Sequence, residues 1–241
     1  QIAEVVRQAE GLEVIRLSFA DQHGILRGKT IMVEDLASAF GSGVTMTTTL
    51  LAKDSSHRTV YPVWSAGGGF GMEEMTGAGD FVMLPDPSTF RILPWASRTG
   101  WLLCDLYFPD GTEVPFSTRR LLRQQIAALD DAGYAMICGL EVEFHVFRLL
   151  DPKLAPEDSG QPATPPSVAM LAHGFQYLTE IRADEHEAIT EILRREILAL
   201  GLPLRTVEVE FGPSQVEMTF QPQPALKAAD TMIEFRNAVK Q

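Results

Sequence analysis

The chain has 241 residues, of which 45% are hydrophobic and 22% charged, and its formal net charge is −12 at pH 7. This acidity argues against nucleic-acid binding, which needs a basic surface. The sequence contains no run of about 18 apolar residues that would span a membrane, and its first residues lack a signal-peptide pattern. The two cysteines, Cys104 and Cys138, lie in apolar runs, where we expect buried free thiols. We therefore expect a cytoplasmic protein that binds neither nucleic acid nor membranes.

The first 108 residues are predicted to form a small mixed sheet with one helix. Alternation of apolar and polar residues indicates a strand at 13–19, and a turn separates it from a second strand at 27–33. Segment 33–43 is typical of a short helix that ends at a pair of glycines, and the glycine-dense segment 65–79 is typical of a loop. Further strands are predicted at 80–85, 90–95 and 100–108.

The pattern of predicted elements changes after a turn at 108–117. Segment 117–134 is predicted to be a helix, with Ser117 as its N-cap and Gly133 at its end. Segment 151–167 is rich in proline and polar residues, so we expect a surface loop. Further helices are predicted at 183–201 and 224–241. The last helix has no glycine, asparagine or proline stop signal, so we expect the chain to be part of a longer protein.

Two glutamates interrupt an apolar run in GLEVEFHVF, residues 139–147. Because residues i and i+2 of a strand point to the same face, Glu141 and Glu143 are expected to project together. His145 follows on the same face and is a candidate further ligand, although a strand histidine is more often simply half-buried.

The letters EVEF return at residues 208–211, which we interpret as a second strand. Glu208 and Glu210 are expected to share one face, with Val207, Val209 and Phe211 behind them. The turn sequence that follows is expected to bring Glu217 back on an adjacent strand.

Carboxylates gathered in this way would repel one another, and at least one would normally take up a proton. A divalent cation removes the repulsion, and hard cations such as Mg²⁺ or Mn²⁺ prefer carboxylate oxygens. The alternative is a solvated sheet face on which lysine or arginine partners neutralise the acids. Two such strands and a third acid after a tight turn favour the metal site.

The segments GLEVEFHVF and EFGPSQVEMTF resemble two motifs of the glutamine synthetase family, and ALKAADTMIEFRNAVK resembles the helix that follows them in that family. DFVMLPDPSTFRILPW and GILRGKT resemble parts of its N-terminal β-grasp domain. The match covers nearly the whole chain in the right order. The resemblance implies an α+β fold, with a β-grasp domain at 1–110 and the first part of a catalytic domain, an antiparallel sheet with flanking helices, at 111–241.

The resemblance also implies a ligase that uses ATP and Mg²⁺ or Mn²⁺ to join glutamate to ammonia or an amine through γ-glutamyl phosphate. By motif position, Glu143, Glu210 and Glu217 would hold one ion, and Glu141 would help hold the ion that bridges the ATP phosphates. It assigns no catalytic or nucleotide-binding residue within these 241 positions. The remaining part of the catalytic domain would supply the other ligands, so we expect this piece alone to be inactive. Relatives form rings, so we expect a homo-oligomer for the whole protein.

Three positions depart from the family pattern. The family's Asp-Gly-Ser-Ser loop, whose aspartate helps bind and deprotonate ammonium, corresponds to SAGGGFGM at 65–72, which has no acid there. Arg205 stands where relatives often have a nucleotide-contacting glutamate, and Glu208 where they often have histidine. A nucleophile larger than ammonia would account for the first change. The alternatives are a family member that has lost catalysis and serves in binding or regulation, and a plain cation-binding module.

Overall fold

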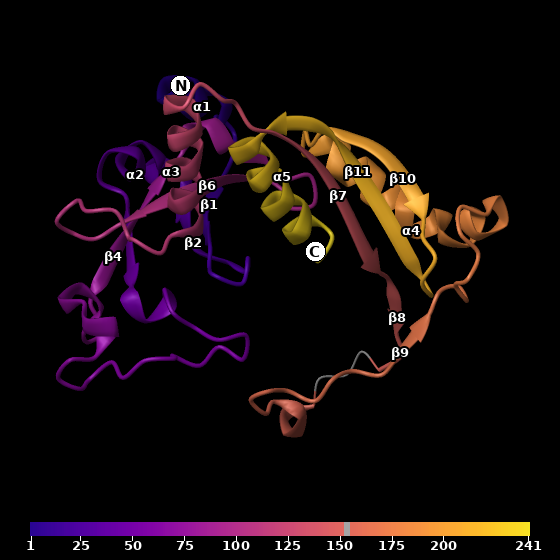
Figure 1. Ribbon diagram of the computed structural model, residues 1–241, viewed down its shortest axis with the longest axis horizontal. Coiled ribbons are helices and arrows are strands. Elements are labelled where there is room, and N and C mark those ends of the chain that lie inside the picture. The colour runs from indigo at the N-terminus through magenta and orange to yellow at the C-terminus, as the bar shows by residue number, and fades with distance from the viewer. Residues whose placement is uncertain (152–154) are drawn as a thin grey trace. The chain divides into compact units, whose positions relative to one another are not determined.

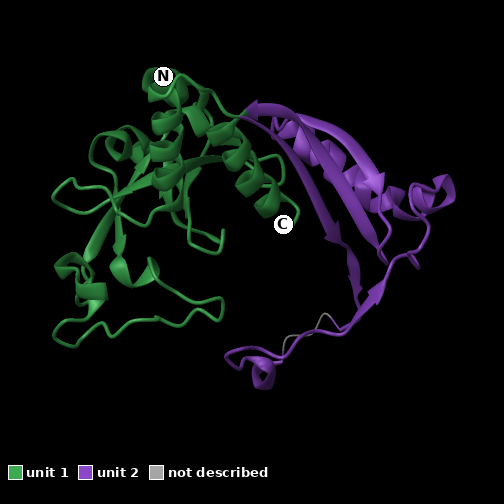
Figure 2. Ribbon diagram, viewed as in Figure 1, with its two compact units in different colours: residues 1–136, 224–241 green, residues 137–223 purple. Residues whose placement is uncertain are grey.

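The computed structural model describes residues 1–151 and 155–241. Contacts divide the chain into two compact units, which Figure 2 colours separately: unit 1 is 1–136 with 224–241, and unit 2 is 137–223. Part of the predicted loop at 151–167, residues 152–154, lies outside the described residues. Each unit combines helices and strands, which confirms the mixed character of the predicted fold (Figure 1).

Unit 1 is built on a six-stranded sheet with the order β2-β1-β6-β4-β3, to which β5 is added by pairing with β6. Strand β1 runs parallel to β6, and the other pairs are antiparallel. The strands are β1 (Val14–Ala20), β2 (Leu26–Met32), β3 (Val44–Thr47), β4 (Asp80–Pro85), β5 (Arg91–Ile92) and β6 (Thr99–Tyr107). The helices are α1 (Ile2–Gln8), α2 (Leu36–Ser42), α3 (Thr118–Asp131) and α5 (Ala225–Ala238). Single 3-10 turns lie at Val33–Asp35, Thr48–Leu50, Gly69–Gly71, Glu73–Met75 and Pro87–Thr89.

The core of unit 1 lies against the central strands of this sheet. Alternate residues of β1 are buried, as the sequence pattern predicts. Buried apolar side chains of β1, β4, β6 and α2 form one cluster that includes Ile15, Leu17, Phe19, Leu36, Phe40, Phe81, Met83, Leu102 and Leu106. The predicted strand at 90–95 shortens to two residues before Pro94, which has no N–H to donate to a ladder.

Two expectations about helices need correction. Helix α1 was not predicted; it is only seven residues long and buries a single side chain, Val5. Ser117 lies at the N-cap position of α3, but its side chain makes no capping hydrogen bond. Gly133 follows the end of α3 with φ of 82°, in the left-handed region that glycine tolerates, so the predicted helix stop is confirmed.

A group of buried ion pairs ties α3 and α5 to the first sheet. Arg119 of α3 donates to Asp86 at 2.7 Å, to Asp105 of β6 at 2.8 Å and to Asp230 of α5 at 2.9 Å. Arg123 adds contacts of 2.8 Å to Asp86 and Asp105. Burial acts to lower the pKa of Arg119, but the hydrogen bond and charge of Asp230 and the charge of Asp105 outweigh it and raise that pKa. Three carboxylates and two guanidinium groups therefore compensate one another within unit 1.

Unit 2 contains a curved three-stranded sheet with the order β10-β11-β7 (Figure 1). Its members are β7 (Ile137–His145), β10 (Leu204–Val209) and β11 (Gln215–Pro224), and a separate ribbon pairs β8 (Phe147–Leu149) with β9 (Val168–Met170). Helix α4 (Glu180–Ala199) packs against β10, and a 3-10 turn lies at Pro156–Asp158. Among the described residues, no helix has the length and apolarity needed to cross a membrane.

Candidate metal centre

Strand β7 presents its glutamates on one face, as the sequence predicts. Exposed and half-buried residues alternate along the whole strand, and Glu141, Glu143 and His145 belong to the exposed set. Leu140, Val142 and Phe144 alternate with them as the half-buried set, which faces the other way.

The second glutamate pair differs from the prediction in one respect. Strand β10 ends at Val209, so Glu210 lies just beyond the strand, where its N–H donates to the carbonyl oxygen of Gln215 at 3.1 Å. Phe211 is 55% exposed and packs edge-on against Phe175, with ring centroids 5.4 Å apart, instead of lying behind the strand. The chain turns sooner than an unbroken EVEF strand would allow.

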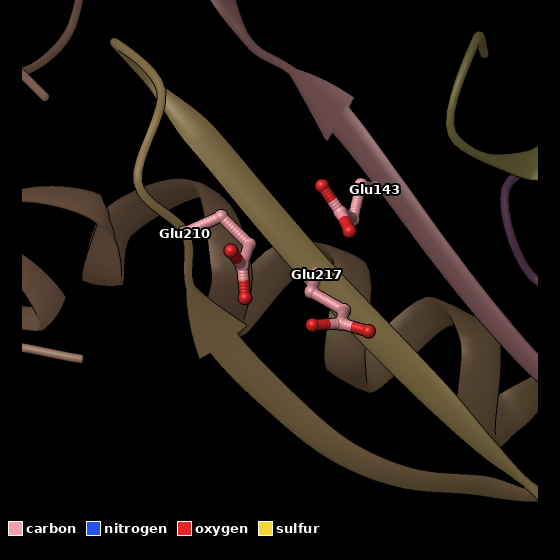
Figure 3. A group of neighbouring side chains, drawn as sticks. All are labelled: Glu143, Glu210 and Glu217. Carbon is pink, nitrogen blue, oxygen red and sulfur yellow. The ribbon is translucent and has the colours of Figure 1, made fainter. Parts of the chain in front are cut away.

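The turn at 211–214 brings the chain back as expected. Strand β11 pairs antiparallel with β10, and Glu217 lies directly opposite Glu208 in the register. This return places Glu217 beside the buried Glu210, and Figure 3 shows both side chains next to Glu143 of β7.

Three of the four predicted ligands come together. Glu143, Glu210 and Glu217 each offer a carboxylate oxygen, and these oxygens all lie within 4.8 Å of one another (Figure 3). We call this group the acid cluster. Glu141 is not one of its members, although its charge acts on Glu217. In the part of the chain that the structure describes, no lysine, arginine or histidine forms an ion pair with the acid cluster.

The electrostatics of the acid cluster disfavour three ionised carboxylates. Burial and the hydrogen bond to Glu210 raise the pKa of Glu217 to about 7, and the charges of Glu210, Glu208 and Glu141 add to the effect. Near neutral pH the acid cluster therefore shares a proton or requires an external cation. This is the electrostatic condition under which a divalent ion is held by carboxylates.

One side chain that the sequence analysis did not single out holds the acid cluster in place. The amide of Gln215 donates through Nε2 to Glu143, and its Oε1 accepts from the N–H of Gly212 at 2.7 Å. A Cβ at position 212 would lie 2.3 Å from that same Oε1 and 2.9 Å from the ring of His145, so a side chain there would displace the Gln215 amide. Gln215 thus links the turn to β7. The close spacing of Gly212, Gln215 and Glu217 was the signal that could have identified it.

His145 has a supporting position at the turn. Its Nδ1 lies 2.7 Å from the carbonyl oxygen of Pro213, and its ring stacks on Phe147 with centroids 5.9 Å apart. Within the described residues, His145 is not part of the group that could hold an ion.

Ser214 holds the turn from the opposite side. The residue has φ of 56°, in the left-handed region, and is buried. Its hydroxyl oxygen accepts hydrogen bonds from the N–H of Leu171 at 2.6 Å and of Ala172 at 3.2 Å. The turn that carries Glu210 is therefore braced by contacts to the segment at 171–172.

Tyr177 is a second residue that the sequence analysis missed. The charge of Glu210 is the main cause that raises the pKa of its phenol, with smaller effects from Glu208, Glu217 and Glu143. Its side chain is 58% exposed, so its hydroxyl is accessible near the acids. No spacing rule in the sequence connects position 177 with the glutamate strands, because the proximity arises from the fold.

The donor set of the acid cluster fits a hard divalent cation. All three groups are carboxylates, the ligands that Mg²⁺ and Mn²⁺ prefer, and no thiol or imidazole is among them. Three acids leave coordination positions for other ligands, which is the arrangement of a catalytic ion.

Comparison with known proteins gives a consistent set of matches. The family model described as glutamine synthetase, catalytic domain, matches residues 115–241. A γ-glutamylanilide synthase of an Acinetobacter species is 40% identical over 237 residues, covering 96% of this chain and 47% of the relative. A γ-glutamylethanolamide synthetase of Streptomyces coelicolor is 29% identical over 238 residues, covering 97% of this chain and 48% of the relative. The chain spans about half the length of the curated relatives it matches.

A solved structure described as a novel glutamine synthase homolog has the same fold. It superposes with a TM-score of 0.71 at 22% identity, over 95% of this chain and 48% of that protein. At this identity the likeness concerns the fold alone.

Proposed function

The chain belongs to the glutamine synthetase family, and from that premise we propose that it is part of an ATP-dependent ligase that joins the γ-carboxylate of glutamate to ammonia or an amine. The observation that carries the proposal is the acid cluster, whose three carboxylates have no basic partner among the described residues. A protein without a cation to bind would gain nothing from such mutual repulsion.

We propose that Glu143, Glu210 and Glu217 hold one Mg²⁺ or Mn²⁺ ion, and that Glu141 helps to hold a second one. A bound ion would supply positive charge to the phosphoryl oxygens of ATP. Gln215 would keep the carboxylate of Glu143 turned toward Glu210 and Glu217, because it bonds both Glu143 and the turn.

The proposed reaction has two steps. The terminal phosphoryl group of ATP passes to an oxygen of the glutamate γ-carboxylate, which releases ADP and makes phosphate the leaving group. The nitrogen of ammonia or of a primary amine then attacks the γ-carbonyl carbon, phosphate leaves, and the nitrogen loses a proton. Water or a carboxylate that does not hold the ion accepts that proton.

The family match also supports a proposal about architecture. Its first matched residue, 115, lies close to the domain boundary expected near 110. We propose that the sheet of unit 1 corresponds to the family's β-grasp domain, and that the complete protein assembles into a homo-oligomeric ring.

The test is a phosphate-release assay on the protein as its complete gene encodes it, with ATP, glutamate, Mg²⁺ or Mn²⁺, and ammonia, ethanolamine or aniline in turn. We expect release that depends on glutamate and on at least one amine, and a loss of at least 100-fold in Glu210→Gln. Glu157→Gln, which changes an exposed acid in the 3-10 turn Pro156–Asp158, is the matched control and should retain full activity. Glutamate-independent release, or equal activity in both variants, would refute the proposal.

A further inference from the structure

Unit 1 contains a polar pocket of about 200 Å³ beside its edge strand β2. This volume is below the range of about 300–1,000 Å³ that is typical of sites for drug-sized molecules, so the pocket suits a small ion. Its lining comes from β1, β2, β6 and the end of α5, which all belong to unit 1. None of the described residues that line it is acidic, although acids outnumber basic residues by 32 to 20 in the whole chain.

Arg16 is a lining residue on the face of the sheet that borders the pocket. In the antiparallel register of β1 and β2 it lies directly opposite Thr30, so the two side chains share one face. The basic residues Arg27 and Lys29 alternate with Thr30 along β2 and project to the other face. There Arg27 contacts Asp21 at 2.7 Å, and Lys29 donates to a backbone carbonyl oxygen of β3 at 2.6 Å. Arg16 is therefore the cation that the sheet offers to the pocket.

The guanidinium of Arg16 has no carboxylate partner and no hydrogen bond among the described residues, although the residue is half-buried. Three other arginines of unit 1, Arg27, Arg91 and Arg119, have side chains between 10% and 18% exposed, and each pairs with a carboxylate. A cation that is partly removed from water without a counter-charge is costly. Packing alone gives no reason for this exception, whereas an anion in the pocket would supply the missing charge.

Neutral hydrogen-bond donors surround this cation at the pocket. Asn237 of α5 is half-buried, and its side-chain amide likewise has no partner among the described residues. Ser18 accepts from Nε1 of Trp101 at 3.1 Å, so its own hydroxyl proton remains available to a ligand. Thr30 adds a second hydroxyl. A guanidinium group with such donors around it matches the oxygens of a phosphate or a carboxylate.

Gly28 leaves space beside Arg16. It lies opposite Ser18 on the pocket face of the sheet and is itself part of the lining. A Cβ at position 28 would clash with the carbonyl oxygen of Leu17, so β1 and β2 approach too closely for a side chain there. A glycine weakens the interior of a strand, but here it keeps the floor of the pocket free of side-chain atoms.

We propose that this pocket is a binding site for a small oxyanion, the phosphate or carboxylate group of a metabolite, with Arg16 as its charged anchor. The inference does not depend on the proposed function, because the lining residues lie in unit 1 and none of them belongs to the acid cluster. A protein with a net charge of −12 does not attract anions at long range, so the selectivity comes from the local donors.

Binding is tested on the protein as its complete gene encodes it, after dialysis to remove divalent metal. Calorimetric titrations use inorganic phosphate and, separately, acetate at fixed ionic strength. Arg16→Met should weaken binding of the anion at least tenfold, because it removes the guanidinium and keeps an unbranched side chain. Arg7→Met removes the same charge from a side chain that is 66% exposed and paired with Glu4, and it should bind like the wild type.

The anion that binds more tightly identifies the ligand as a phosphoryl compound or a carboxylate. Binding of neither anion, or equal binding by the wild type and Arg16→Met, would overturn the inference.

Thermal unfolding separates a ligand site from a structural role of Arg16. Without the anion, Arg16→Met should melt at the wild-type temperature or above it, because the variant loses a cation that has no partner. The anion should raise the melting temperature of the wild type and leave that of Arg16→Met unchanged. A lower melting temperature of Arg16→Met without the anion would mean that the fold itself uses this charge, and would overturn the inference.

A further variant distinguishes this pocket from the acid cluster of unit 2. Glu210→Gln changes the acid cluster and should bind the anion like the wild type. Weaker anion binding in Glu210→Gln would place the anion at the acid cluster and overturn the inference. Loss of ligation in Glu210→Gln with unchanged anion binding would uphold both proposals.

Discussion

The two units each gather three carboxylates, but they neutralise them in opposite ways. In unit 1, Asp86, Asp105 and Asp230 surround Arg119, and Arg123 contacts the first two of them. In unit 2, the acid cluster has no ion-pair partner among the described residues.

This difference separates a structural group of charges from a functional one. Where the chain supplies its own cations, the charges compensate internally and join α3, α5 and the first sheet. Where it supplies none, the pKa of Glu217 is raised to about 7, so this carboxyl holds a proton below neutral pH, and an external cation can replace that proton. The absence of a basic partner among the described residues, more than the number of acids, points to a site for a divalent ion.

The largest effect is expected from removing the arginine that neutralises Asp86, Asp105 and Asp230. Arg119→Met leaves Asp230 buried without its partner, and we expect the free energy of unfolding to fall by about 3–5 kcal/mol in urea denaturation. Arg120→Met on the same helix removes an ion pair to the half-exposed Glu113, and it should cost less than about 1 kcal/mol. Equal losses in the two variants would mean that the buried group does not hold the helices.

The acid cluster should instead make the stability of the protein depend on a divalent metal ion. Wild-type protein at an Mn²⁺ concentration of about 100 times the dissociation constant should gain about 2.7 kcal/mol in unfolding free energy. Glu217→Gln should weaken Mn²⁺ binding at least a hundredfold and lose most of this gain, as measured by thermal unfolding with and without Mn²⁺. Glu157→Gln should keep the full gain. A gain that survives in Glu217→Gln would place the ion elsewhere.

A smaller effect is expected from the residue that orients the cluster. Gln215→Met keeps the length of the side chain but removes its bonds to Glu143 and Gly212. We expect Mn²⁺ binding to weaken about tenfold, as for other residues that orient metal ligands, measured by calorimetric titration. The separate variant Gln223→Met, at the far end of β11, should bind Mn²⁺ normally. Unchanged affinity in Gln215→Met would show that Glu143 needs no support.

The smallest effect is expected in the pH dependence of stability without metal. The folded-state pKa of Glu217, about 7, lies above its ordinary value of 4.5, so the folded state binds more protons between these values. The contribution of Glu217 is fully present below pH 4.5 and is lost as the pH rises through 7. Mn²⁺ binding should strengthen over the same interval, because the ion competes with the proton. A Glu217→Gln protein with an unchanged slope of unfolding free energy against pH would contradict this assignment.

The sequence by itself determined the local features of this protein. Alternation along 137–145 placed Glu141 and Glu143 on one face, and the turn after Glu210 predicted the return of the chain to Glu217. Such features follow from the two-residue repeat of a strand and from turn chemistry, which involve only near neighbours. The motifs in this region also indicated the family.

Only the tertiary structure decided which of these residues meet. Glu143 joins the acid cluster and Glu141 does not, because the distance between strands depends on how β7 and β11 pair. Arg119 and Asp230 are 111 positions apart in sequence, and their contact brings α3 and α5 into unit 1. The pocket beside Arg16 likewise combines residues of β1, β2, β6 and α5. These arrangements depend on packing between segments that are distant along the chain, and no local pattern encodes that packing.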